Sequence, residues 1–334
     1  MYTTLWLQNL LTVGGLGFVV WLVVHGSRSE RWQRAWLRLR RDRMGIFAGL
    51  VIGAYLAIGA LEMIQFPHGD YDTISILGWL TQSIPAEKSY SAPWDSVLLS
   101  VQHPDPLSGW HLLGTDALGK DTFVQSLRAC RTALIIGGLT SAIYIPLGTI
   151  FGILAGYFRK HVDDAIQYVY TVLYSIPEIL LLISILLVLG KSVGNMCFAL
   201  AVTGWVTLCR LIRGETMRQT ERPYVAAARA LGQSHWKIIT RHLLPNVMHL
   251  VLINAVLGFS HLVLAEAMLS YLGVGSPIGT PSWGVMIDSA RGELSREPIV
   301  WWNLVSATAA LFGLVLSLNL FGDALRRAFD PKRG

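Results

Sequence analysis

The stretch TALIIGGLTSAIYIPLGTIFGILAG, residues 132–156, runs for 25 residues without a single charged side chain. A run of about 20 such residues is long enough to cross the hydrocarbon core of a bilayer as a helix. Helices of soluble proteins rarely contain so long an uncharged run, because one face of such a helix normally meets water. The stretch therefore predicts a transmembrane helix.

Six further long apolar stretches, each with at most two charged residues, flank it at residues 5–25, 44–64, 165–189, 193–213, 246–270 and 301–322. Hydrophobic residues make up 53% of the 334-residue chain and charged residues only 14%, against about a quarter charged in soluble domains. This pattern excludes a soluble enzyme and a peripheral protein with one anchor. The predicted fold class is an all-α integral membrane protein.

The basic residues predict how the chain is oriented in the membrane. Twenty of the 27 lysines and arginines lie in the segments 26–43, 157–164, 210–243 and 323–334. Lysine and arginine collect on the cytoplasmic side of membrane proteins. We therefore expect a cytoplasmic C-terminus and an N-terminus outside. The same placement accounts for the net charge of +6, so we expect no nucleic-acid partner.

The first apolar run, 5–25, has two possible interpretations. No lysine or arginine precedes it, whereas seven arginines follow within residues 28–43. A signal peptide has the opposite charge pattern and a small-residue cleavage site, which is absent here. We interpret the run as a retained membrane span, with a cleaved signal peptide as the alternative.

These features together predict the organisation of the chain. An extra N-terminal span and a basic cytoplasmic linker occupy 1–43, and a first core-associated span occupies 44–64. An extracytoplasmic cap at 65–131 precedes a core at 132–322 and a cytoplasmic tail at 323–334. Within the core, residues 214–245 form the longest cytoplasmic loop.

The most informative part of that loop is YVAAARALGQSHWKIITRHLLP, residues 224–245. Its alanines favour a helix and keep the helix surface smooth enough to enter a groove on a partner. Gly232 suits the left-handed position that ends a helix, and Ser234 can cap a second short helix. Pro245 fits the first turn of the next span. An ordinary helical connector is the alternative.

The spacing of small residues, glycine and Leu244-Pro245 resembles the EAA loop of ATP-binding-cassette (ABC) importer permeases. Other motifs agree in order: LGTDALGKD at 113–121, GYF at 156–158 with Asp163, YSIP at 174–177, AEA at 265–267, SYLG at 270–273, PSWG at 281–284, NLFGD at 319–323 and DP at 330–331. Together they resemble the C-type subunit of dipeptide/oligopeptide permeases, closely over 112–331 and loosely over 34–64.

Two features depart from that family. Ala226 stands where the EAA triplet begins with glutamate, so one acidic contact to the ATPase is missing. The docking helix is still expected, because its fit depends on shape. The span 5–25 is generally missing from six-span relatives. The resemblance thus implies a type I ABC importer permease bundle of six spans plus one extra N-terminal span.

The resemblance also implies partners. We expect a homologous second permease in a heterodimer, two ATP-binding subunits, an extracytoplasmic solute-binding protein and surrounding membrane lipid, all at the bacterial inner membrane. The loop residues expected to contact an ATPase are Tyr224, Ala226, Ala227, Ala228, Arg229, Gly232, Ser234, Leu244 and Pro245. ATP and Mg are expected on those partners, since this chain has no G-x-x-x-x-G-K-[ST] loop and should bind no cofactor.

The implied function is import of di- or oligopeptides. Nickel chelates, antimicrobial peptides and glycopeptides are alternative solutes within the family. An ion-coupled secondary carrier is an alternative from another class, but such carriers usually show internal repeats. A membrane enzyme is a further alternative, and no convergent acid, base and nucleophile supports it, so we expect no catalytic residues.

Polar residues inside spans are often functional. Pro177 predicts a kink and a water-lined cavity beside Glu178. Asn254 and His261 share one face of their helix, and Glu266 lies further along it. We expect Glu178, Asn254, His261 and Glu266 to line the solute path; the alternative is that they join helices.

Three glycines spaced four residues apart, Gly148, Gly152 and Gly156, are expected to let two helices approach closely. Three cysteines give no disulfide framework, and no histidine or cysteine spacing predicts a metal site.

Overall fold

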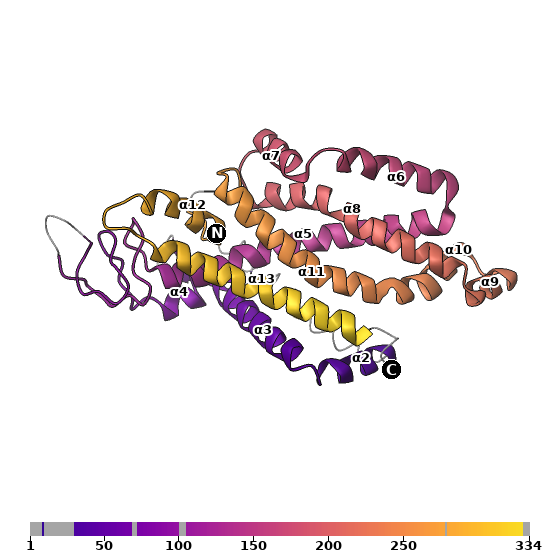
Figure 1. Ribbon diagram of the computed structural model, residues 1–334, viewed down its shortest axis with the longest axis horizontal. Coiled ribbons are helices and arrows are strands. Elements are labelled where there is room, and N and C mark those ends of the chain that lie inside the picture. Colours follow the sequence, from indigo (N-terminus) through magenta and orange to yellow (C-terminus); the bar gives the residue numbers. More distant parts are fainter. Residues whose placement is uncertain (1–8, 10–29, 69–71, 100–104, 278, 330–334) are drawn as a thin grey trace. The chain divides into compact units, whose positions relative to one another are not determined.

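The computed structural model describes residues 9, 30–68, 72–99, 105–277 and 279–329. The predicted span 5–25 lies outside these residues apart from Asn9, and so does the end of the tail. The chain divides into two compact units. One contains residues 1–135 with 263–328 and the other residues 136–262 with 329–334, and Figure 1 labels their elements.

Five helices in the described part of the chain are long and apolar enough to cross a membrane. They are α3 (Arg43–Met63), α5 (Thr122–Phe158), α8 (Val193–Thr220), the continuous helix His235–Tyr271 that ends in α11 (Leu244–Tyr271), and α13 (Trp302–Phe329). Each covers one of the apolar runs predicted from sequence, apart from at most one residue at the end of the run. The all-α membrane fold is therefore confirmed.

The predicted span 165–189 is not one straight helix. It consists of α6 (Lys160–Tyr174) and α7 (Glu178–Leu189), which are bent by 83° at the residues between them. Pro177 precedes α7 directly and adopts φ −52°, ψ 126°. Proline has no N–H to continue the ladder of α6, and it disfavours a helical Ile176 before it. The predicted kink is present, and it is a sharp bend.

Helix α5 begins ten residues before the apolar run 132–156. The Asp121 carboxylate caps it, because Oδ1 accepts a hydrogen bond from the Val124 N–H at 2.9 Å. The first turns of α5 are polar, so hydropathy alone does not reveal them. The predicted boundary between cap and core, at 131, thus falls inside a helix.

The segment 65–121 of the first unit contains little regular structure. Strands β1 (Gln65–His68) and β2 (Asp72–Ser75) pair antiparallel and lead into α4 (Ile76–Leu80). The irregular chain that follows is tied to α13 by the Trp302 indole, which donates to the Thr115 carbonyl at 2.9 Å. Helix α12 (Trp283–Glu293) is tied to α5 in the same way, from Trp283 to the Ser126 carbonyl at 3.0 Å.

In the second unit, α5 and α8 approach each other along three glycines. A Cβ atom added to Gly148, Gly152 or Gly156 would lie 2.9, 2.8 or 2.7 Å from a backbone carbonyl oxygen of α8. Real Cβ atoms need more room than this. Only glycine at these positions therefore allows the two helices to pack at this separation.

Candidate functional site

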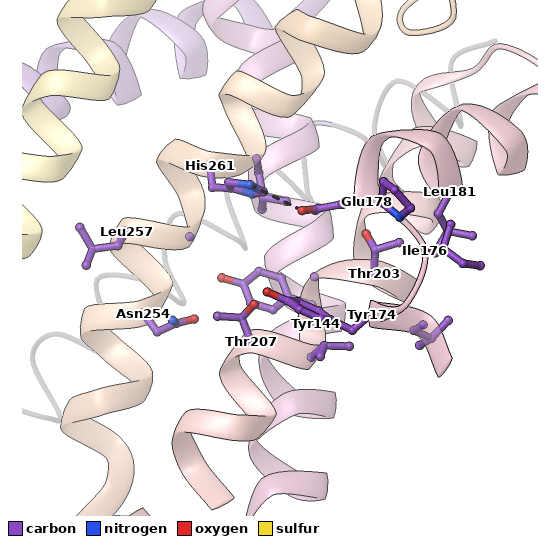
Figure 2. Close-up of a pocket in the computed structure, with 16 residues that line it drawn as sticks. Tyr144, Tyr174, Ile176, Glu178, Leu181, Thr203, Thr207, Asn254, Leu257 and His261 are labelled. Carbon is purple, nitrogen blue, oxygen red and sulfur yellow. Dashed lines mark ion pairs between the residues drawn. The ribbon is translucent and has the colours of Figure 1, made fainter. Parts of the chain in front are cut away.

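Residues of the second unit enclose a cavity of about 540 Å³ (Figure 2). Its wall combines α5, the bend between α6 and α7, α8 and α11. The lining residues are Tyr144, Leu173, Tyr174, Ile176, Pro177, Glu178, Leu181, Thr203, Gly204, Val206, Thr207, Asn254, Leu257, Gly258, His261 and Leu262. This volume is typical of small-molecule sites.

The bend brings Glu178 into this wall as the first residue of α7. Its Oε2 lies 4.0 Å from Nε2 of His261 on α11, and both side chains remain substantially exposed. Figure 2 shows the two side chains pointing toward each other from separate helices. The pair places a carboxylate acceptor and an imidazole at the wall of the cavity.

Asn254 and His261 lie on the same face of α11, with Gly258 between them. A Cβ atom at Gly258 would lie 2.2 Å from the Tyr144 hydroxyl oxygen. The absence of a side chain there lets the Tyr144 ring approach α11. The structure thus brings together three of the four residues expected from sequence to line a solute path.

Sequence reasoning missed several polar residues of the cavity. Thr203 and Thr207 stand one turn apart on α8, and Tyr174 ends α6. The Arg210 guanidinium lies 4.1 Å from the centre of the Tyr174 ring, which fixes that ring at the edge of the cavity. The four-residue spacing of the threonines was the available signal.

Glu266 does not lie in this cavity, which corrects the sequence-based expectation. Its side chain is buried in the first unit, with 1% of the residue exposed. Its Oε1 accepts hydrogen bonds from the hydroxyls of Ser270, Ser276 and Ser282, at 2.8, 3.0 and 2.7 Å. Glu266 therefore holds the segment after α11 in place, because these hydroxyls converge on its carboxylate.

The loop 214–245 contains helix α9 (Pro223–Ala230), which is followed by Gly232 in the left-handed conformation, φ 72°. The Gly232 N–H bonds the Arg229 carbonyl at 3.0 Å, and the Gln233 N–H bonds the Ala228 carbonyl at 3.1 Å. This pair of bonds is a Schellman motif. The helix end predicted at Gly232 is present.

Ser234 begins the next helix, as predicted, since its hydroxyl accepts from the Lys237 N–H. This helix, α10 (His235–Ile238), does not stay separate: it runs through a π-helical segment, η1 (Ile239–Leu243), into α11. The Leu244 N–H reaches back to the Ile239 carbonyl. Pro245 follows and has no N–H to donate, so the wider turn lies where the α-helical ladder would be interrupted.

One side of this loop is exposed and the other side is buried. Val225 and Ala228 are buried, whereas Ala226, Ala227 and Arg229 are exposed. The exposed side chains include two large apolar ones, Leu231 and Trp236, at 80% and 67% exposure.

Helix α10 is anchored to the end of α5. The Tyr157 hydroxyl lies 2.8 Å from Nδ1 of His235, and the Arg229 guanidinium lies 5.1 Å from the Tyr157 ring centre. The loop is therefore coupled mechanically to a membrane helix.

The described residues offer neither the side-chain cluster expected for a metal site nor an exposed thiol. They contain no group of three or more histidine, cysteine, aspartate or glutamate side chains that could hold a metal ion. Cys130, Cys197 and Cys209 are buried free thiols.

Comparison with known proteins places this geometry in a family. Residues 148–334 match the family model described as "binding-protein-dependent transport system inner membrane component". The chain belongs to this family. The match contains the cavity's α8 and α11 walls and the whole cytoplasmic loop.

Individual relatives agree over nearly the full length. The oligopeptide transport system permease protein OppC of Bacillus subtilis is 29% identical over 301 residues, 90% of each chain. The glutathione transport system permease protein GsiD of Pectobacterium atrosepticum is 30% identical over 306 residues, 90% of this chain and 91% of the relative. The dipeptide transport system permease protein DppC of Bacillus subtilis is 29% identical over 301 residues, which are 90% of this chain and 85% of the relative.

Membership in this family of inner membrane components makes the chain a multi-pass permease subunit of an ABC importer, which works with other transporter components. Its role is transport and not catalysis of a chemical step. The cavity and the exposed loop are the two candidate sites of this chain.

Proposed function

We propose that this chain forms one half of the translocation path of an ATP-driven importer of di- and oligopeptides. Relatives named as oligopeptide, dipeptide and glutathione permeases support this solute class, because each matches most of the chain. None of these three relatives is named for the transport of nickel chelates or glycopeptides. The cavity beside the bend at Pro177 is the observation that carries the proposal.

The chemistry of the cavity suits a peptide. Glu178 can accept hydrogen bonds from a protonated amino terminus, and His261 can donate one to a carboxylate. Asn254 can both donate to and accept from a backbone amide. The mostly apolar remainder of the wall tolerates varied side chains, as an importer of many peptides requires.

The orientation follows from charge. We place the segments that hold 20 of the 27 lysines and arginines in the cytoplasm, with the C-terminus inside and the N-terminus outside. The cytoplasmic loop and the outer segment 65–121 then lie on opposite sides of the membrane. The outer segment is the surface proposed to receive a solute-binding protein.

Coupling to ATP is assigned to α9 and α10. We place α9 in a groove of one ATP-binding subunit, where exposed Ala226, Ala227 and Leu231 provide an apolar contact. The ATPase pair would hold ATP and Mg, and a second permease would complete the bundle. ATP then shifts the equilibrium between outward and inward states because it binds one of them more tightly.

Affinity purification in mild detergent, with every co-purifying protein identified by mass, tests this assembly. Two ATPases and a second, similar permease are expected. Reconstitution of that complex with its binding protein should give ATP-dependent uptake of labelled dipeptide into vesicles, and a nickel chelate should not compete. A chain that purifies alone and moves solute without ATP would overturn the proposal.

A further inference from the structure

Helix α2 (Glu30–Leu39) carries a dense set of arginines directly before a membrane span. Three residues separate it from α3, which begins at Arg43. The Asp42 carboxylate caps α3 by accepting from the Met44 and Gly45 N–H groups, at 3.1 and 3.2 Å. Because α3 starts there, α2 must lie close to the bilayer surface.

One face of α2 is fixed to the end of α13. Ala35 and Leu39 are buried, and the Arg38 guanidinium donates to the Ala328 carbonyl at 3.4 Å. Beyond the helix, Arg327 donates to Asp42 at 2.7 Å. These contacts set which face of α2 turns outward, and they lie within a single compact unit.

The outward face forms a shallow depression of about 230 Å³. The described part of its lining consists of Arg34, Leu37 and Arg38 on one face of α2 and of Arg41 in the turn after the helix. Three guanidinium groups therefore surround one small volume. Leu37 is 60% exposed at its edge.

A second exposed side chain completes an amphipathic surface. Trp36 is exposed beside Leu37, and the Arg40 guanidinium lies 5.4 Å from its ring centre. Tryptophan favours the membrane–water interface, and basic amphipathic helices with such residues lie in that interface. The arginines of α2 thus suit the headgroup of a lipid, and its exposed apolar side chains suit the acyl chain.

We propose that this depression binds the phosphate headgroup of an anionic phospholipid, with Trp36 and Leu37 against its glycerol and upper acyl chain. Guanidinium groups bind phosphate oxygens bidentately. Basic pockets beside membrane helices recognise anionic headgroups in this way. The site does not depend on the transported solute.

The test uses the purified full chain in its complex, in nanodiscs that contain phosphatidylglycerol and phosphatidylcholine. Native mass spectrometry counts the lipids that stay bound. The wild-type complex should retain phosphatidylglycerol selectively. Arg34→Gln with Arg41→Gln should weaken that retention about 30-fold, as expected for two lost charges near the surface.

Matched variants separate this site from general charge and from folding. Lys160→Gln with Arg218→Gln removes two exposed basic groups elsewhere and should leave retention unchanged. Arg34→Lys with Arg41→Lys keeps the charge and should retain most of the lipid.

Three results would overturn the proposal. The first is equal retention by the Arg34→Gln/Arg41→Gln complex and the wild type. The second is displacement of the lipid by millimolar inorganic phosphate, which would indicate a site for free phosphate. The third is loss of a co-purifying protein from the glutamine variant with lipid unchanged, which would indicate an acidic protein partner.

Discussion

Arg213 on α8 donates two hydrogen bonds to Asp163 on α6, from Nε to Oδ1 at 2.5 Å and from Nη2 to Oδ2 at 2.7 Å. Two parallel bonds of this kind fix both the distance and the angle between the partners. Arg213 directly precedes the cytoplasmic loop, and its carbonyl is the atom that a Cβ at Gly156 would meet. This one turn of α8 therefore contacts both α5 and α6 next to the loop.

We expect Asp163→Asn to destabilise the chain by about 3 kcal/mol, the low end for breaking a buried ion pair, because Arg213 keeps some contact with solvent. Thermal unfolding in detergent measures this loss. Glu215→Gln is the matched control, since it breaks the pair with exposed Arg218 and should cost less than about 1 kcal/mol. Similar losses in both variants would contradict a special role for the Asp163 pair.

The glycine contact between α5 and α8 gives a prediction with opposite signs at two positions. Gly152→Ala should destabilise by about 1–3 kcal/mol, because the new methyl would lie 2.8 Å from the Cys209 carbonyl and the Ile212 Cβ. Gly138→Ala, on the same helix, meets nothing within 4 Å and should be neutral or stabilising by up to about 1 kcal/mol. Unfolding midpoints that move together would refute close packing at Gly152.

Features encoded locally were predictable from sequence. The spans follow from runs of apolar residues, and the end of α9 at Gly232 follows from glycine's freedom to adopt positive φ. A kink at Pro177 was equally local. Its 83° angle was not, because the packing of α6 and α7 against their neighbours sets it.

Features that depend on distant segments were not predictable. Glu178 and Glu266 look alike in sequence, as single acids within apolar helices. Only the return of Ser276 and Ser282 onto α11 shows that Glu266 is enclosed. Thr203 and Thr207 share the four-residue spacing of one helix face, but their position opposite Glu178 and Asn254 depends on how α8 packs against α7 and α11.

A large side chain at the end of α9 should uncouple the transporter. Gly232→Trp would place tryptophan on the exposed loop surface and force it into a left-handed conformation, which costs about 1–2 kcal/mol locally. We expect ATP hydrolysis to continue while transport falls at least about tenfold. Paired assays of both activities in vesicles measure this.

Gly190→Trp is the matched control for that variant. Gly190 also has positive φ, 85°, and like Gly232 has no neighbour within 4 Å of an added Cβ. It connects α7 to α8, away from the proposed ATPase contact. Coupled transport should persist there, and equal uncoupling in both variants would argue against docking through α9.

The outer segment should lose stability in acid. Burial would raise the pKa of the Glu87 carboxyl, but hydrogen bonds from His111 and from the Gly109 and Ser108 N–H groups hold it below its usual value of 4.5. A lowered pKa contributes stability above pH 4.5, and this is lost as pH falls through the lower, folded-state value. The protection of residues 105–121 against hydrogen exchange, relative to the intrinsic exchange rate at each pH, should therefore fall below pH 4.5.

Glu87→Gln should flatten this acid dependence, since it removes the titrating group, while Asp95→Asn in the same segment should leave it in place. An unchanged acid profile in Glu87→Gln would assign the effect to other carboxyls. His111 also contacts Asp121, at 2.9 Å, so Asp121→Asn provides an independent measure of that second contact.

Substitution of the two intramembrane glutamates should affect different properties: uptake for Glu178 and stability for Glu266. Glu178→Gln should leave thermal stability unchanged, because the carboxylate is exposed to the cavity and its neighbour His261 lies 4.0 Å away. Uptake of peptides with a free amino terminus should fall about tenfold, since one charge interaction of about 1.4 kcal/mol is lost. N-acetylated peptides carry no such charge, so their uptake should not change.

Glu266→Ala should instead lower stability without altering solute preference. Three buried hydroxyls would lose their common acceptor, and an unsatisfied buried group costs about 1–3 kcal/mol. The ratio of free to acetylated peptide uptake distinguishes the two roles, because a general loss of folded protein lowers both rates equally. If that ratio is unchanged in Glu178→Gln, the carboxylate does not meet the amino terminus; if it changes in Glu266→Ala, the buried cluster is part of the path after all.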